Sequence, residues 1–76
     1  MEKQKFYSEV EEMLETEDKI MEDTNLRELE EYDSMVVLSL IAFIDENFSK
    51  KLSGEQFKDI TTVKSLMDKI GADNFS

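Results

Sequence analysis

The run from Met35 to Ile44 constrains the fold more than any other part of the sequence, because nine of its ten residues are apolar and only Ser39 is polar. A helix that packs on one side needs an apolar stripe only about 100° wide. The run is also far shorter than the roughly 20 residues that cross a bilayer as a helix. It therefore predicts a core helix with more apolar surface than one core face can cover.

The surplus apolar residues of this helix predict a docking surface. At about 100° per residue, the predicted core face consists of Val37, Leu40, Ile41, Ile44 and Phe48. The residues predicted to lie opposite the core or on its flanks are Met35, Val36, Leu38, Ser39, Ala42, Phe43 and Glu46. Exposed apolar patches on small domains mark interaction sites, although single exposed apolar residues are also common. We therefore predict that a partner protein binds Met35, Val36 and Leu38, with Glu30 and Glu31 beside them; a tolerated apolar surface is the alternative.

The first third of the chain is predicted to form one helix and a long loop. With no Pro, only two Gly and no strand-like alternation, the whole sequence favours helices. A first helix is expected from about Glu2 to Leu14 or Glu15, where apolar residues recur at helical spacing: Phe6, Val10, Met13 and Leu14. Residues 16–33 are then expected to form a loop that scattered apolar side chains tether to the core.

Capping patterns predict three further helices. Asp33 or Ser34 is expected to cap a second helix that ends near Phe48, because short oxygen-bearing side chains accept the free N–H groups of a first turn. The capping-box spacing of Ser53 and Gln56 predicts a brief third helix around Glu55 to Asp59. Thr61 or Thr62 is expected to cap a last helix that stops at Gly71. The predicted fold is all-α: a small four-helix bundle of three main helices and one short helix, in a single domain over residues 1–76.

Composition excludes several classes of function. The sequence has no Cys and no His, which excludes disulfides, zinc sites built on thiolates or imidazoles, and Ser-His or Cys-His catalysis. A formal net charge of −10 argues against nucleic acid and favours basic protein partners. Most carboxylates are expected on solvated faces rather than in a sheltered pocket, so we predict no catalytic residues, no resident metal and no enzyme activity. The polar, acidic N-terminus lacks the apolar run of a secretory signal, which predicts a cytoplasmic protein.

Three short motifs carry a resemblance to a known family. Asp33-Ser34-Met35 stands at the start of the second predicted helix, Asp45-Glu46-Asn47-Phe48 closes that helix, and Ile60-Thr61-Thr62-Val63 leads into the last one. In this order and spacing the sequence resembles the acyl carrier proteins over nearly its whole length.

The resemblance implies a cofactor and partners. It implies that a phosphopantetheinyl transferase moves 4′-phosphopantetheine from coenzyme A onto Ser34. Acyl groups are then carried as thioesters on this phosphopantetheine arm. It also implies that Asp33 helps to hold a metal during that transfer, beside a role as helix cap. Further implied partners are acyl ligases or acyltransferases with basic and apolar docking surfaces. An ordinary helix cap is the alternative role of Ser34.

Departures from the family pattern point to a specialised carrier, and two other functions compete with it. Many fatty-acid carriers have acids where this chain has Val36 and Ser39, and Gly-Ala where it has Glu31-Tyr32. We therefore expect a free-standing monomer that serves a dedicated surface-glycan, lipid or secondary-metabolite pathway. A helical protein-binding adaptor without a prosthetic group is the alternative. A calcium sensor is disfavoured, because no segment has the ligand spacing of an EF-hand loop.

Overall fold

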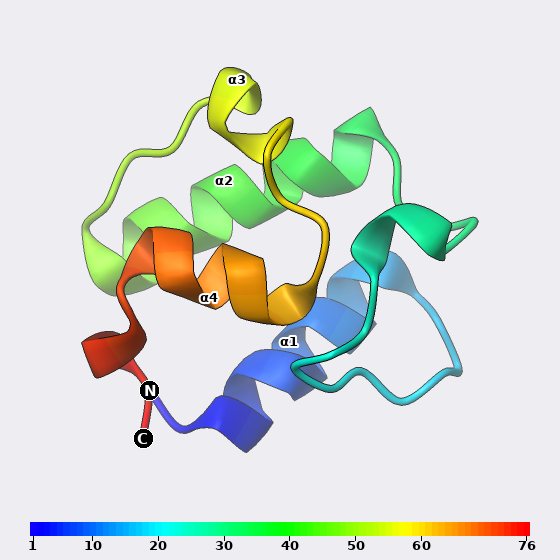
Figure 1. Ribbon diagram of the computed structural model, residues 1–76, viewed down its shortest axis with the longest axis horizontal. Helices are drawn as coiled ribbons and strands as arrows, with labels where there is room; N and C mark the ends of the chain where they lie inside the picture. Colours follow the sequence, from blue (N-terminus) through cyan, green and yellow to red (C-terminus); the bar gives the residue numbers. More distant parts are fainter.

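Four α-helices and two short 3₁₀ turns account for the regular structure of the computed structural model, which describes residues 1–76 (Figure 1). The helices are α1 (Lys3–Leu14), α2 (Ser34–Phe48), α3 (Gly54–Phe57) and α4 (Val63–Ile70). The 3₁₀ turns are η1 (Leu26–Glu28) and η2 (Ala72–Asn74). The predicted all-α bundle of three main helices and one short helix is confirmed. None of the helices is both long enough and apolar enough to span a membrane.

The short helix α3 differs from its predicted bounds of Glu55 to Asp59. It begins directly after Ser53, whose N–H donates to Oε1 of Gln56 at 2.9 Å, so the predicted reciprocal pair does mark its start. It ends at Phe57 because the backbone then tightens: the Asp59 N–H bonds the carbonyl of Gln56, three residues back. A 3₁₀ pattern of this kind closes a helix end.

The last helix follows its capping signals closely. Ser65 N–H donates to Oγ1 of Thr62 at 3.1 Å, and Thr62 N–H donates to Oγ of Ser65 at 3.0 Å, so Thr62 is the cap. Gly71 ends the helix with a φ of 118°, a left-handed value that side chains with a Cβ disfavour. Its N–H still bonds the carbonyl of Met67 at 2.9 Å, which satisfies one of the free carbonyls of the last turn.

The buried face of α2 is rotated relative to the predicted one. Leu40 and Ile44 are fully buried as predicted, but the third buried residue is Val36, which is only 8% exposed and not outward-facing. Phe43 is also half-buried, because its ring packs on Phe6 of α1 at a centroid distance of 6.2 Å. Positions 36, 40 and 44 form one stripe four residues apart. The expectation that Val36 lies on the outer surface was therefore wrong, because α1 covers the flank on which it lies.

Aromatic side chains hold the first helix, the second helix and the C-terminal segment together. Phe6 of α1 packs edge-on against Phe75 at a centroid distance of 4.9 Å, and Phe48 lies 5.2 Å from Phe75. Edge-to-face pairs of this kind add to the free energy gained by burial alone. Phe6 is fully buried and Phe75 is 8% exposed. The aromatic cluster thus ties the C-terminal segment to α1 and α2, and the two chain termini lie side by side (Figure 1).

The connection over residues 16–33 is tethered to α1 and to the start of α4. Ile20 and Leu26 are buried, as their apolar character predicts. Ile20 N–H donates to a carboxylate oxygen of Glu11 at 3.0 Å. Leu26 N–H donates to the carbonyl of Thr61 at 2.7 Å, and Val63 N–H donates to the carbonyl of Thr24 at 3.0 Å. These bonds place η1 beside the approach to α4 and hold the residues that lead to Ser34.

Candidate functional site

Ser34 is the first residue of α2, and its side chain is exposed. The preceding residue, Asp33, is the cap: its carboxylate oxygen accepts the N–H of Val36 at 3.0 Å. The structure therefore decides between the two capping residues that the sequence left open. Asp33 fills the capping role, and the Ser34 hydroxyl makes no hydrogen bond within the fold and is exposed to solvent.

One groove beside Ser34 is lined by two cations and an apolar floor. We call it the cationic groove; it has a volume of about 540 Å³ and is lined by Arg27, Tyr32, Ser34, Val37, Gly54, Phe57 and Lys58. Phe57 is buried, while Tyr32 and Val37 are half-buried. Three elements meet here: η1 brings Arg27, the start of α2 brings Ser34, and the region of α3 brings Phe57. No acidic residue lines this groove.

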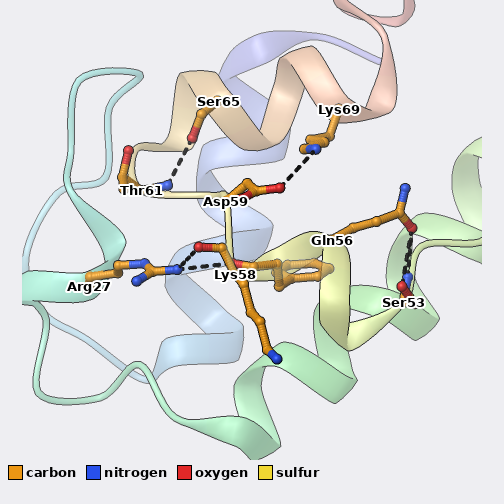
Figure 2. A network of polar contacts seen from close by, with 9 residues as sticks. Arg27, Ser53, Gln56, Lys58, Asp59, Thr61, Ser65 and Lys69 are labelled. Carbon is orange, nitrogen blue, oxygen red and sulfur yellow. Dashed lines mark hydrogen bonds and ion pairs between the residues drawn. The ribbon is translucent and has the colours of Figure 1, made fainter.

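Arg27 forms one wall of the cationic groove and is fixed there by backbone carbonyls (Figure 2). Its Nε donates to the carbonyl of Ile60 at 2.9 Å, and its Nη2 donates to the carbonyls of Phe57, at 3.4 Å, and Lys58. No carboxylate lies within ion-pair distance of the guanidinium. Burial raises the pKa of Tyr32, while the Arg27 charge acts in the opposite direction. Arg27 thus presents a positive charge that no side chain neutralises.

A second groove lies between the end of α1 and the start of α2. We call it the acidic groove; it has a volume of about 410 Å³ and is lined by Met13, Leu14, Glu15, Glu31, Asp33, Met35, Val36 and Ser39. Three of these residues are acids and none is a base. Glu15, Glu31 and Asp33 are all exposed. The groove therefore presents carboxylates over an apolar floor on which Val36 lies.

Two predicted docking residues are exposed on α2. Met35 is 74% exposed and Leu38 is 66% exposed, which confirms the outward orientation expected of both. Glu30 and Glu31 are exposed in the approach to the helix, also as expected. Val36 differs, because it contributes to the core and to the floor of the acidic groove. Whether any of these residues binds a partner stays a prediction.

No local sequence pattern identifies the residues of the cationic groove around Ser34. Arg27 had one signal that could have drawn attention to it: it is the only base between Lys19 and Lys50. Phe57 and Lys58 fall within the predicted third helix, whose capping pattern indicates no binding role for either. Their proximity to Ser34 depends on tertiary packing, which no local pattern encodes.

Comparison with known families identifies the class of this protein. A family model described as the phosphopantetheine attachment site matches residues 4–70. The match covers most of the chain, so the chain belongs to this family, and the predicted resemblance to carrier proteins is confirmed.

Proteins of this family carry a covalently attached cofactor. The family bears 4′-phosphopantetheine attached covalently to a serine, and its domains are non-catalytic carriers that interact with modifying and acyl-handling enzymes. The site suits such a group, because Ser34 combines an exposed hydroxyl with a groove that can receive an anionic arm. No curated protein and no solved structure matches the chain.

Proposed function

We propose that Ser34 is the serine that carries the 4′-phosphopantetheine arm. The strongest support comes from the start of α2, where Asp33 caps the helix and the exposed Ser34 hydroxyl is left free. The family match spans this position. A helix N-terminus also favours a phosphodiester, because free N–H groups and the positive end of the helix dipole face it.

In the loading reaction Ser34 acts as the acceptor. Its oxygen forms a bond to the phosphorus atom of coenzyme A that bears the pantetheine, and the bond from that phosphorus to the bridging oxygen breaks. The adenosine bisphosphate portion leaves, and the hydroxyl proton passes to a base of the transferase. Asp33, one residue away, would help to hold the transferase's metal, as the resemblance to the acyl carrier proteins implies. These roles need no activated nucleophile in this chain.

The loaded chain would be an acyl carrier that delivers thioester-bound groups to partner enzymes. When bound, the arm supplies the thiol that this cysteine-free sequence lacks. We assign residues 1–76 to one monomeric, cytoplasmic carrier domain without enzyme activity of its own. Its partners would be the transferase and acyl ligases or acyltransferases with basic and apolar docking surfaces. The departures at Val36 and Ser39 favour a specialised surface-glycan, lipid or secondary-metabolite pathway over general fatty-acid synthesis.

The exposure of Met35 and Leu38 would also suit a second function. An adaptor without a prosthetic group could bind proteins through the same apolar surface. The adaptor would need no accessible serine at position 34, and it would gain nothing from the cationic groove. The carrier accounts for both features.

Intact-mass measurement after co-expression with a phosphopantetheinyl transferase separates the two functions. The carrier gains the mass of one arm, and Ser34→Ala abolishes the gain while keeping the helical circular dichroism spectrum. Ser8→Ala is the matched control, because Ser8 is an exposed serine of α1 that lines neither groove, and its loss should leave loading unchanged. An unmodified wild-type chain, or loading that survives in Ser34→Ala, contradicts the assignment.

A further inference from the structure

Attachment of the arm places a new negative charge in an acidic environment. Asp33 is adjacent to Ser34, and Glu30 and Glu31 are exposed a few residues earlier. The Asp33 carboxylate also occupies the Val36 N–H, one of the donors that a helix start would otherwise offer to a phosphodiester. Like charges at short range repel, and water only partly screens them near a protein surface. A phosphodiester here therefore needs compensating positive charge.

The cationic groove supplies that charge on one side of Ser34 only. Two of the nine bases in the chain, Arg27 and Lys58, line it without any acid. Arg27 is held in place by three carbonyls, so little side-chain order has to be gained when an anion arrives. Lys58 pairs only with Glu55, at 3.2 Å, and both side chains of that pair are highly exposed. Exposed pairs are weak, so Lys58 is free to exchange its partner.

We infer that the cationic groove binds the phosphodiester and the inner half of the arm, so that the resting arm lies against the protein between η1 and α3. The inference rests on the attachment proposed for Ser34. Arg27 and Lys58 meet the phosphodiester, while Val37 and Phe57 offer apolar surface to the two methyl groups next to it. The groove volume of about 540 Å³ leaves room for this part of the arm.

The first test uses the unloaded chain and two free compounds, so that it does not depend on loading. 4′-Phosphopantetheine carries the phosphate, and pantetheine is its neutral control. In nitrogen-edited NMR titrations the phosphorylated compound should shift the Arg27 side-chain N–H and the Lys58 amide, and pantetheine should bind more weakly. Lys58→Gln should weaken the phosphorylated compound roughly two- to five-fold. Lys51→Gln, which removes an exposed lysine outside the groove, is the control and should have no effect.

The second test uses the chain with the arm attached. Loading should broaden the phosphorus NMR signal of the arm and shift the same Arg27 and Lys58 resonances, and added salt should reverse both changes because it screens the contact. Gly54→Leu should also release the arm without unfolding the protein, since a Cβ at Gly54 meets no atom within 4 Å.

The outcomes of the two tests separate this inference from the proposed function. A loaded chain with a sharp, salt-independent phosphorus signal overturns the groove and leaves the carrier intact. Equal effects of Lys58→Gln and Lys51→Gln, or equal binding of the two free compounds, overturn it as well. A chain that gains no mass contradicts the carrier instead.

Discussion

The two grooves that flank Ser34 have opposite charge, although the chain as a whole is strongly acidic. The cationic groove is lined by Arg27 and Lys58 and by no acid, whereas the acidic groove is lined by Glu15, Glu31 and Asp33 and by no base. The formal net charge of the chain, −10, has the same sign as the acidic groove and the opposite sign to the cationic groove. Positive and negative side chains lie in separate grooves around the start of α2. The net charge of the chain therefore does not predict the electrostatic potential at Ser34.

This separation suggests a division of the surface between the arm and the partner. The cationic side suits an anion attached to Ser34, and the acidic side suits a basic enzyme surface. Met35 lies in the acidic groove and is 74% exposed, so apolar and acidic contacts are offered to a partner on that same side.

A carboxylate in the floor of the acidic groove should damage the fold. Val36→Asp is expected to lower the free energy of unfolding by about 3 kcal/mol or more, since it removes a buried apolar side chain and buries a charge beside other acids. Leu38→Asp is the control at an exposed position and should change stability by no more than about 0.5 kcal/mol. Urea denaturation measures both variants. If Val36→Asp and Leu38→Asp were equally stable, Val36 would lie at the surface and would not belong to the core beneath the acidic groove.

Removal of the cap between the two grooves should have a smaller effect. Asp33→Ala is expected to lower the free energy of unfolding by about 0.5–2 kcal/mol, because the Val36 N–H loses its acceptor. Asp33→Asn should keep that hydrogen bond and most of the stability, yet it should slow loading by the transferase if the carboxylate helps to hold the metal. Thermal melts and loading rates separate the two roles. An Asn variant that loads at the wild-type rate would limit Asp33 to capping.

Neutralising the acidic groove should slow association without changing stability. Glu15→Gln combined with Glu31→Gln is expected to reduce the transferase's kcat/KM several-fold at low salt, because exposed charges mainly steer encounter. Asp68→Asn with Asp73→Asn removes the same amount of charge from exposed positions outside both grooves and serves as the control. The difference between the two double variants should disappear at high salt. If the control slows loading equally, total charge rather than this groove guides the transferase.

The two tyrosines should respond in opposite directions to salt. Burial raises the pKa of Tyr7, and Glu22 and Asp23 raise it further; burial also raises the pKa of Tyr32, but Arg27 lowers it. Screening should therefore lower the pKa of Tyr7 and raise that of Tyr32. Absorbance titrations of the wild type and of Tyr32→Phe assign the two curves. Shifts of the same sign would contradict the opposite charge surroundings.

The same raised pKa values predict a loss of stability in alkali. A tyrosine whose pKa is higher in the folded state contributes stability that is complete below its unfolded pKa, near 10, and that disappears as the pH rises through the folded pKa. The free energy of unfolding should therefore fall above about pH 10. Tyr32→Phe should remove part of that dependence and keep the rest, which belongs to Tyr7.

Local sequence patterns predicted the main helices well because their signals are themselves local. The polar residues at helix starts marked α2 and α4 to within a residue, and Asp33 and Thr62 indeed cap them. The apolar run in α2 also predicted surplus surface, which Met35 and Leu38 provide. What failed was the rotation of α2 about its axis. A helix this apolar has no single preferred face, so its packing against α1 decided that Val36 is buried.

The grooves could not be predicted, because they depend on residues far apart in the chain. Arg27 reaches the carbonyl of Ile60, 33 positions away, through backbone atoms that every residue type possesses. No side-chain pattern marks such acceptors. The acidic lining was visible as composition, but its separation from Arg27 and Lys58 requires the folded chain.

The hydrogen bonds between the long connection and the approach to α4 also have a kinetic consequence. They pair Leu26 with Thr61 and Thr24 with Val63, so a large loop has to close before they form, and loop closure lowers the entropy of the chain. Helices with local contacts form faster than contacts between distant segments. We therefore expect the segment around η1 and the approach to α4 to assemble late in refolding. Its amide hydrogens should exchange earlier than those in the cores of α1 and α2. An arm docked in the cationic groove would slow that exchange, so the prosthetic group would stabilise a part of the fold that assembles late.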